Sequence, residues 1–301
     1  MSEKVIKSYK GFDKDMQCRD FQYEVRKEYN MDGEIKCCNR GFHACKSPLE
    51  VWDYYDMLNS RFAEVEQSGK IDEEEKSTKV CSSHIKIKAE LKLADIINIG
   101  VEWLKDVTSP SKVKTDGALD GNGDRKKQIG SSGYSAQIGS SGYSAKIGSS
   151  GYSAQIGSSG DYAKIGSSGD YAKIGSSGYS AQIGSSGYSA QIGSSGDSAK
   201  IGSSGDYAKI GSSGDYAQIG SSGYSAQIDS TGEDSVIMCA GDNSKAKAKV
   251  GSWITLAEWE WSDEKNRNVP VCVKTEYVDG ENIKADTWYQ LKNGKFVEVN
   301  E

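Results

Sequence analysis

Proline and histidine are scarce in this chain of 301 residues, which has three prolines and two histidines. The two histidines, His43 and His84, with scattered cysteines do not supply a closed zinc site, so no metal is expected. No apolar run approaches the roughly 20 residues that span a bilayer. The first residues, MSEKVIKSYKGFDKDM, also lack the apolar core of a signal peptide. We therefore expect a soluble protein without a membrane partner.

A basic surplus is missing as well. The 37 Lys and Arg residues are outnumbered by 43 Asp and Glu, which gives a net charge of −6. Domains that bind nucleic acids usually carry a clustered basic surplus, so the composition argues against direct nucleic-acid binding. The seven cysteines contain no paired CxxC spacing, and their odd number favours reduced thiols. The expected location is the cytoplasm.

A nine-residue repeat dominates the middle of the chain. Its first copy is IGSSGYSAQ, and Ile recurs at every ninth position from Ile129 to Ile237. Side chains in a strand alternate between two faces, so the Ala and Ile of SAQI share one face while Ser and Gln share the other. The following SSG supplies small residues for a corner. Two nonapeptides form a coil of 18 residues with two facing strands, and stacked coils satisfy the backbone hydrogen bonds. The sequence therefore predicts a mainly β protein built around a two-sided β-solenoid.

Three positions of the repeat vary and face outward. The sixth is Tyr or Asp, the seventh is Ser or Tyr, and the ninth is Gln or Lys. Copies with Asp at the sixth position mostly have Tyr at the seventh and Lys at the ninth. Tyrosines at these positions either cover the coil edges or form a contact surface for a protein or glycan, since Tyr buries a large area at low entropic cost. The expected contact residues are Tyr162, Lys164, Tyr171, Lys173, Tyr207, Lys209 and Tyr216.

The charge and the residue pattern of the repeats argue against two further functions. Residues 129–227 contain five Asp and five Lys, so the array is neutral and does not imitate the acidic surface of DNA. The calcium-binding β-roll repeat, GGxGxDxUx, requires an Asp in each turn. Ser135 occupies the equivalent position in the first copy. We therefore expect no calcium ladder along the solenoid.

Composition divides the chain into four segments. Residues 1–110 have ordinary globular composition and predict a small α+β head domain. Residues 111–128 are expected to form a linker and a cap on the first coil. The solenoid is expected to occupy residues 129–245, and residues 246–301 predict an aromatic-rich β cap with hairpins, because the terminal coils of a solenoid must not expose an open edge.

Local patterns place several elements in these segments. The sequence predicts a helix over residues 47–58 with Ser47 as its N-cap, and a strand over residues 82–91 from alternating apolar residues. The tripeptides VDG, 278–280, and KNG, 292–294, predict hairpin turns. A structural role in the cap is expected for Trp253, Trp259, Trp261 and Trp288.

Three parts of the chain carry a resemblance: GFHACKSPLEVWDYY at 41–55, the IGSSG array, and the ending from GSWITLAEW to TWYQLKNGKFVEV. Together they resemble uncharacterised proteins of phages and prophages of Gram-positive bacteria. This resemblance implies a phage origin, and phage accessory proteins often bind and inhibit host machinery, for example a bacterial defence system such as CRISPR-Cas. A rigid rod presents side chains at fixed spacing with little ordering cost, so we expect a non-enzymatic accessory protein that uses the solenoid and cap to bind and inhibit a host protein. Its location would be the cytoplasm of the infected bacterium. No cofactor is expected for that function, and self-association through the solenoid stays open.

The N-terminal segment also resembles the ADP-ribosyltransferase fold. SYKGF places a lysine where such enzymes carry His or Arg, and GFHA matches their G-aromatic-x-A strand. The resemblance implies that a tyrosine after this strand stacks on nicotinamide and that a later glutamate orients the ribose hydroxyl. The alternative function is thus an NAD-dependent transferase with the solenoid as a targeting module. Its candidate residues are Lys10, His43, Tyr54, Tyr55, Glu64 and Glu66.

Overall fold

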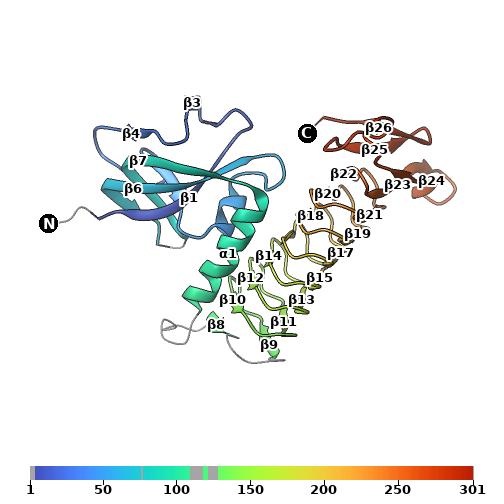
Figure 1. Ribbon diagram of the computed structural model, residues 1–301, viewed down its shortest axis with the longest axis horizontal. Coiled ribbons are helices and arrows are strands. Elements are labelled where there is room, and N and C mark those ends of the chain that lie inside the picture. The colour runs from blue at the N-terminus through green and yellow to red at the C-terminus, as the bar shows by residue number, and fades with distance from the viewer. Residues whose placement is uncertain (1–3, 76, 109–117, 121–127, 301) are drawn as a thin grey trace. The chain divides into compact units, whose positions relative to one another are not determined.

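The computed structural model describes residues 4–75, 77–108, 118–120 and 128–300. The chain divides into two compact units, Met1–Trp103 and Leu104–Glu301, which we call the head unit and the solenoid unit (Figure 1). One α-helix, α1 (Leu93–Val107), runs across the boundary between them. Strands make up 47% of the chain and helices 7%, so the prediction of a mainly β protein is confirmed.

The head unit is built on antiparallel strands in the order β4-β7-β5-β1-β6. Because β6 also pairs with β7, the four strands β1, β5, β7 and β6 close into a ring. A two-residue turn joins two short strands, β2 and β3, into a hairpin after β1. The bounds are β1 (Ile6–Phe12), β2 (Gln17–Cys18), β3 (Phe21–Gln22), β4 (Glu28–Asn30), β5 (Phe42–Cys45), β6 (Arg61–Glu73) and β7 (Lys79–Leu91).

The core of the head unit follows the period of two that its strands impose. In β7, Ile85 and Ile87 are completely buried, whereas Lys86 between them is not. Phe12 from β1 and Val65 from β6 complete the same apolar cluster. Full burial of each such side chain contributes about 2 kcal/mol. The strand predicted over residues 82–91 is therefore confirmed as part of β7.

The helix predicted over residues 47–58 is wrong in type and extent. The segment forms only η1 (Leu49–Asp53), a 3-10 helix that begins after Pro48. The N–H groups of Tyr54 and Tyr55 both donate to the Val51 carbonyl oxygen, at 3.1 Å, and the helix ends there. Four of its five residues are buried, so tertiary packing rather than an amphipathic helical period determines the conformation.

Helix α1 was not among the expected elements, although its pattern is amphipathic. Ile97, Val101 and Leu104 recur at helical spacing and are completely buried. Gly100 lies on the same side, where an added Cβ would come within 2.6 Å of the Leu49 side chain. The helix therefore approaches η1 closely, and an alanine at position 100 would not fit without movement of Leu49.

The solenoid unit contains two sheets whose strands alternate along the chain. The ten-stranded sheet consists of β8 (Ala118–Asp120), β10 (Gln137–Ser140), β12 (Gln155–Ser158), β14 (Lys173–Ser176), β16 (Gln191–Ser194), β18 (Lys209–Ser212), β20 (Gln227–Ser230), β22 (Lys245–Ala248), β25 (Tyr289–Lys292) and β26 (Lys295–Glu298). The nine-stranded sheet consists of β9 (Gln128–Ser131), β11 (Lys146–Ser149), β13 (Lys164–Ser167), β15 (Gln182–Ser185), β17 (Lys200–Ser203), β19 (Gln218–Ser221), β21 (Val236–Cys239), β23 (Trp253–Ser262) and β24 (Arg267–Tyr277).

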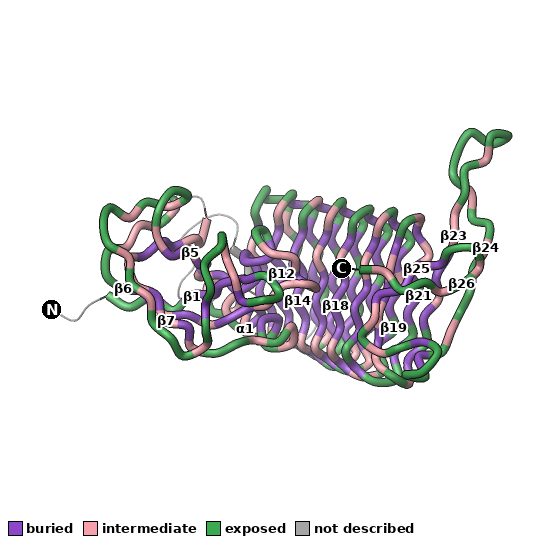
Figure 2. Tube along the Cα trace, turned by 90° about the horizontal axis from the view of Figure 1, so that it is seen from above, coloured by how far each residue is buried: buried purple, intermediate pink, exposed green. Residues whose placement is uncertain are grey.

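Solenoid strands pair in parallel with the strand 18 residues further on, without any shift in register. Ile147 of β11 is paired with Ile165 of β13, and Ile156 of β12 with Ile174 of β14. Figure 2 shows the resulting stack of coils, in which buried and exposed positions recur from coil to coil. The solenoid has about seven turns, and the predicted two-sided coil of two nonapeptides is confirmed.

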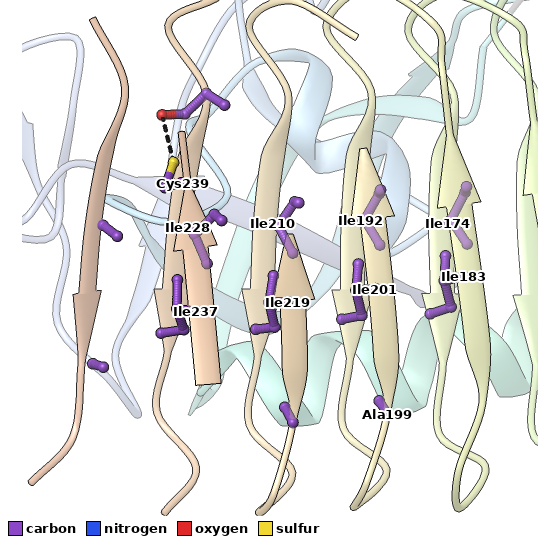
Figure 3. Packing of buried hydrophobic residues seen from close by; sticks show 14 of the residues in the cluster. Ile174, Ile183, Ile192, Ala199, Ile201, Ile210, Ile219, Ile228, Ile237 and Cys239 are labelled. Atoms are coloured by element: carbon purple, nitrogen blue, oxygen red, sulfur yellow. Dashed lines mark hydrogen bonds between the residues drawn. The ribbon is translucent and has the colours of Figure 1, made fainter. Parts of the chain in front are cut away.

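Two columns of isoleucine fill the solenoid. One column comes from each sheet, and the two face each other across the interior, as Ile183 and Ile192 do in Figure 3. Their exposed fractions are 4% and 0%, and the alanine that precedes each strand is also buried. The burial of about 2 kcal/mol per isoleucine explains why the repeat keeps Ile at one position.

The corners between the strands need two special backbone positions. The fifth residue of the repeat is Gly because its neighbour in the stack lies too close: a Cβ on Gly178 would come within 2.1 Å of the Gly160 carbonyl oxygen. The seventh residue has a left-handed backbone at most corners, with φ of 56° at Tyr162 and 52° at Ser180. Its N–H donates to a carbonyl oxygen of the adjacent coil, as Tyr162 does to Tyr179 at 2.8 Å. This hydrogen bond offsets the cost of the left-handed conformation, about 1 kcal/mol per residue.

Antiparallel pairing replaces the parallel ladder at the C-terminal end, where β24 pairs with β23 and β26 with β25. The hairpin predicted at KNG is confirmed: Asn293 and Gly294, with φ of 51° and 65°, join β25 to β26. The hairpin predicted at VDG is wrong. Val278 is completely buried and its N–H donates to the Ser252 carbonyl oxygen at 2.9 Å, so the chain enters a loop there.

The tryptophans of this end differ in their surroundings. Trp288 is 3% exposed, and the amines of Lys245 and Lys247 lie 4.7 and 4.9 Å from its ring centre. Trp253 packs against Tyr277 and is half-exposed.

The expected linker and first-coil cap at 111–128 lies outside the described residues except for 118–120 and 128. Within the described part of the chain, no helix is long and apolar enough to cross a membrane.

We expect Gly196→Ala to lower the free energy of unfolding of the solenoid by about 2 kcal/mol, because its Cβ would lie 2.1 Å from the Gly178 carbonyl oxygen. Gly184→Ala is the matched control, since nothing lies within 4 Å of a Cβ at that position. Thermal unfolding followed by circular dichroism measures both effects. Equal stability of the two variants would contradict the close stacking of the corners.

Candidate functional site

A continuous row of tyrosines follows one edge of the solenoid. The corners after the nine-stranded sheet carry one tyrosine in each of six successive coils, and we call this row the six-tyrosine edge. Neighbouring rings have centres 5.0 to 5.8 Å apart, and each side chain is between 39% and 69% exposed. Its members are Tyr134, Tyr152, Tyr171, Tyr188, Tyr207 and Tyr224.

The opposite edge, which follows the ten-stranded sheet, is interrupted. Tyr143, Tyr162 and Tyr179 form a short row with ring centres 5.3 and 5.8 Å apart. The next corner has Asp197 followed by serine, and Tyr216 comes after it. We call this the four-tyrosine edge, and its shorter row offers a smaller aromatic surface.

The aspartates of the repeat hold the corners in register. The Asp170 carboxylate accepts the backbone N–H of Tyr188 at 2.8 Å, and that of Asp206 accepts the N–H of Tyr224 at 2.8 Å. Each bond joins a sixth-position residue to the sixth position of the next coil. In an Asp-containing corner the tyrosine occupies the seventh position. The carboxylate at the sixth position binds the neighbouring corner, and the ring at the seventh position continues the row of tyrosines. This division of roles explains why Asp and Tyr covary.

The seven contact residues expected from the sequence do not form one surface. Tyr171 and Tyr207 lie on the six-tyrosine edge, whereas Tyr162 and Tyr216 lie on the four-tyrosine edge. Lys164 is on β13 of the nine-stranded sheet. The other two lysines, Lys173 on β14 and Lys209 on β18, belong to the ten-stranded sheet.

Sequence reasoning missed the sixth-position tyrosines of the six-tyrosine edge, namely Tyr134, Tyr152, Tyr188 and Tyr224. A signal for them was present. Alternate nonapeptides share an edge, so sorting the copies into odd and even sets separates the two rows. The covariation of Asp with Tyr points instead to the seventh-position tyrosines, which are divided between the two edges.

A second candidate site is a cavity of about 560 Å³ in the head unit. Four of the six residues suggested by the transferase resemblance line it. Lys10 comes from β1, His43 from β5, and Tyr54 and Tyr55 from the chain just after η1. Gly11 makes this arrangement sterically possible, because any Cβ at that position would lie 2.4 Å from the Tyr55 ring.

The two glutamates suggested for the same site do not line the cavity. Glu64 is paired with Tyr9 across β1 and β6, and its carboxylate forms an ion pair with Lys7 at 2.8 Å. Glu66 forms an ion pair with Lys88, also at 2.8 Å. Lys7 and Lys10 are an odd number of positions apart on β1, so their side chains project from opposite faces of the strand. Glu64 and Glu66 lie on the same face as Lys7 and therefore on the face opposite to Lys10.

The polar groups of the cavity form a connected set. The Tyr55 hydroxyl donates to the Cys18 sulfur at 2.8 Å, and the Lys10 amine lies 3.5 Å from the same sulfur and 3.1 Å from the His43 carbonyl oxygen. The Cys38 N–H donates to His43 Nε2 at 3.0 Å. Burial, followed by the nearby positive charge of Lys10, lowers the pKa of His43 below its usual range. A neutral imidazole agrees with Nε2 acting as the acceptor.

Residues 6–99 match the model of a domain of unknown function, DUF7666. The matched range contains all the strands of the head unit and thus the whole wall of the cavity. Neither a search of curated proteins nor a search of solved structures found a match to the chain. The match therefore delimits the head unit and leaves its function to be inferred from its geometry.

Burial lowers the pKa of Lys10 below its usual range. The unfolded chain then holds a proton that the folded chain gives up between the two pKa values, so stability rises with pH in that window. We expect Lys10→Met to raise the free energy of unfolding of the head unit at pH 7. The gain should shrink as the pH approaches about 10.4, the ordinary pKa of lysine. Hydrogen exchange of β1, β6 and β7 measures this, and a gain independent of pH would contradict it.

Proposed function

We propose that this chain is a non-enzymatic binding protein whose solenoid recognises another protein through the six-tyrosine edge. One observation carries the proposal: six half-exposed tyrosines stand in an unbroken row on a stacked backbone. Tyrosine is enriched in binding hot spots and offers a large amphipathic surface with only two rotatable side-chain bonds.

The rigid backbone adds to the suitability of this edge. Every corner is hydrogen bonded to the next coil, and several corners are held twice, by the main chain and by an aspartate. Little conformational entropy is therefore lost when the row meets a partner. The neutral charge of the repeats favours a contact based on packing and hydroxyl hydrogen bonds over one based on electrostatic attraction.

The resemblance to phage proteins supplies the kind of partner. We propose that the target is a protein of a Gram-positive host, such as a component of a defence system of the CRISPR-Cas kind, and that binding inhibits it in the cytoplasm of the infected cell. The position of Glu64 and Glu66 outside the cavity favours this non-enzymatic function over the NAD-dependent transferase. The proposed function needs no cofactor.

The test replaces four central rings of the row by serine, with the substitutions Tyr152→Ser, Tyr171→Ser, Tyr188→Ser and Tyr207→Ser. The tagged full chain captures its target from a Gram-positive host lysate, and the affinity of the purified target is then measured. A hot-spot tyrosine is worth about 2 kcal/mol, or roughly 30-fold in Kd, so we expect the variant to lose measurable binding. Addition of the unaltered chain should also reduce the activity of the target.

The matched control carries the same four changes on the four-tyrosine edge, at Tyr143, Tyr162, Tyr179 and Tyr216. It loses equally many rings but leaves the six-tyrosine edge intact, and we expect it to bind like the original chain. Circular dichroism verifies that both variants keep the solenoid. Retention of binding by the first variant, or an equal loss in both, would refute recognition by the six-tyrosine edge.

A further inference from the structure

The charged residues that line the cavity of the head unit all have one sign. Lys10, Arg19, Arg40 and Lys79 are among its lining residues, and no aspartate or glutamate of the described chain is. Lys79 has a counter-ion outside the lining, because its amine forms an ion pair with Glu74 at 3.2 Å. The other cations give the cavity a positive character that an anion would neutralise.

Lys10 is the most deeply placed of these cations, with 4% of its surface exposed. Within the described chain, its amine contacts the His43 carbonyl oxygen and the Cys18 sulfur, and it lies 5.5 and 5.3 Å from the ring centres of Phe12 and Tyr23. None of these groups is a carboxylate. A buried amine without a carboxylate partner is costly to keep charged, so this site lacks the counter-ion that burial of a lysine ordinarily requires.

The hairpin of β2 and β3 brings a second cation to the cavity wall. Its two-residue turn consists of Arg19 and Asp20, both with a left-handed backbone at φ of 51° and 60°. Turns of this kind favour Asn-Gly, and an arginine there costs about 1 kcal/mol. Residues held in such conformations cluster at ligand sites, and Arg19 lies close enough to disfavour the charged forms of both Lys10 and His43.

Aromatic rings make up much of the remaining wall. Phe21, Tyr23, Tyr54 and Tyr55 line the cavity together with the cations. Ligand sites of similar volume combine such apolar rings with a few polar groups that fix the orientation of the ligand. A planar ring could lie against these side chains while its acidic group reaches the amine of Lys10.

We propose that this cavity binds a small planar organic anion, either an aromatic carboxylate or an aromatic phosphate monoester, whose acidic group is the counter-ion of Lys10. Arg19 contributes a second positive charge from the rim, and the aromatic wall holds the planar ring. The proposal concerns binding alone. It requires neither NAD nor the recognition of a protein by the solenoid, and it stands if both of those functions fail.

The anion also changes the protonation of the cavity. Its charge favours the protonated amine of Lys10, so binding takes up a proton in the pH range where burial leaves part of this amine neutral, and it weakens as the pH rises through that range. The other titratable or charged groups around Lys10 are Cys18, Arg19, Tyr23, His43, Cys45 and Tyr55. Burial raises the pKa of Tyr23, Cys45 and Tyr55, which keeps these three neutral near pH 7 and leaves the amine as the principal group that gains charge.

The test is isothermal titration calorimetry of the full chain with four probes. The probes are 1-naphthyl phosphate, 2-naphthoate, the uncharged 2-naphthol, and inorganic phosphate. We expect at least one of the two naphthyl anions to bind with proton uptake, detected in buffers of different ionisation enthalpy. The stronger of the two identifies the preferred acidic group. The uncharged naphthol and inorganic phosphate should each bind more weakly by about tenfold or more, because naphthol lacks the acidic group and inorganic phosphate lacks the aromatic ring.

Two variants and a control locate the binding. Lys10→Met should weaken binding of the preferred naphthyl anion about tenfold or more and abolish proton uptake. Arg19→Ala should weaken binding of the same anion severalfold. Lys7→Met is the matched control, because Lys7 lies on the same strand but pairs with Glu64 on the opposite face, and it should bind like the original chain. Hydrogen exchange establishes that each variant is folded. The proposal is overturned if neither anion binds at millimolar concentration, if naphthol binds as tightly as the anions, or if folded Lys10→Met retains full affinity.

Discussion

The solenoid depends on the stacking of identical coils at a period of 18 residues. Because the strands pair in parallel without a shift, each side chain lies against its counterpart in the next coil. The isoleucines therefore form columns in the interior and the tyrosines form rows at the edges. The same constraint fixes glycine at the fifth position, where the carbonyl oxygen of the adjacent coil occupies the space that a Cβ would need. The aromatic surface is thus a direct result of the repeat that builds the core.

A stack of this kind must also end without offering an open edge to other chains. The nine-stranded sheet ends in β24, an edge strand of 11 residues with exposed valines. Pro270 within it has no N–H to donate, and Arg267 and Lys274 place charge along it, which are devices that discourage pairing with another strand. The sheet opposite ends in β26, which is only four residues long. Both ends thereby limit growth of the ladder.

The sequence predicts the solenoid well because its constraints are local and repeated. Alternation in SAQI identifies the inward face, and the period identifies the coil. The head unit is harder to predict, since η1 is shaped by burial on all sides and Tyr55 is positioned by contact with a glycine of another element. Lys10, His43, Tyr54 and Tyr55 were expected together and do line one cavity. The glutamates were misplaced with them because the pairing of β1 with β6, which decides their face, is not visible in a motif. Cys18 and Arg19 were missed because a two-residue turn, formed without the usual Asn-Gly, brings them to the cavity.

Left-handed backbone conformations have different meanings in the two units. In the solenoid they recur at the seventh position of the repeat, at Ser144 and at each corner from Tyr162 to Asn243, so they reflect the geometry of the repeat. In the head unit, Met16, Arg19 and Asp20 share this conformation within five residues, beside a buried amine that has no carboxylate partner in the described chain. Strain that is not repeated and lies next to an unbalanced charge is not explained by packing alone. It is explained if the hairpin holds a cation where the head unit receives an anion, and that makes the cavity, rather than the regular solenoid, the place where the irregular features of the fold converge.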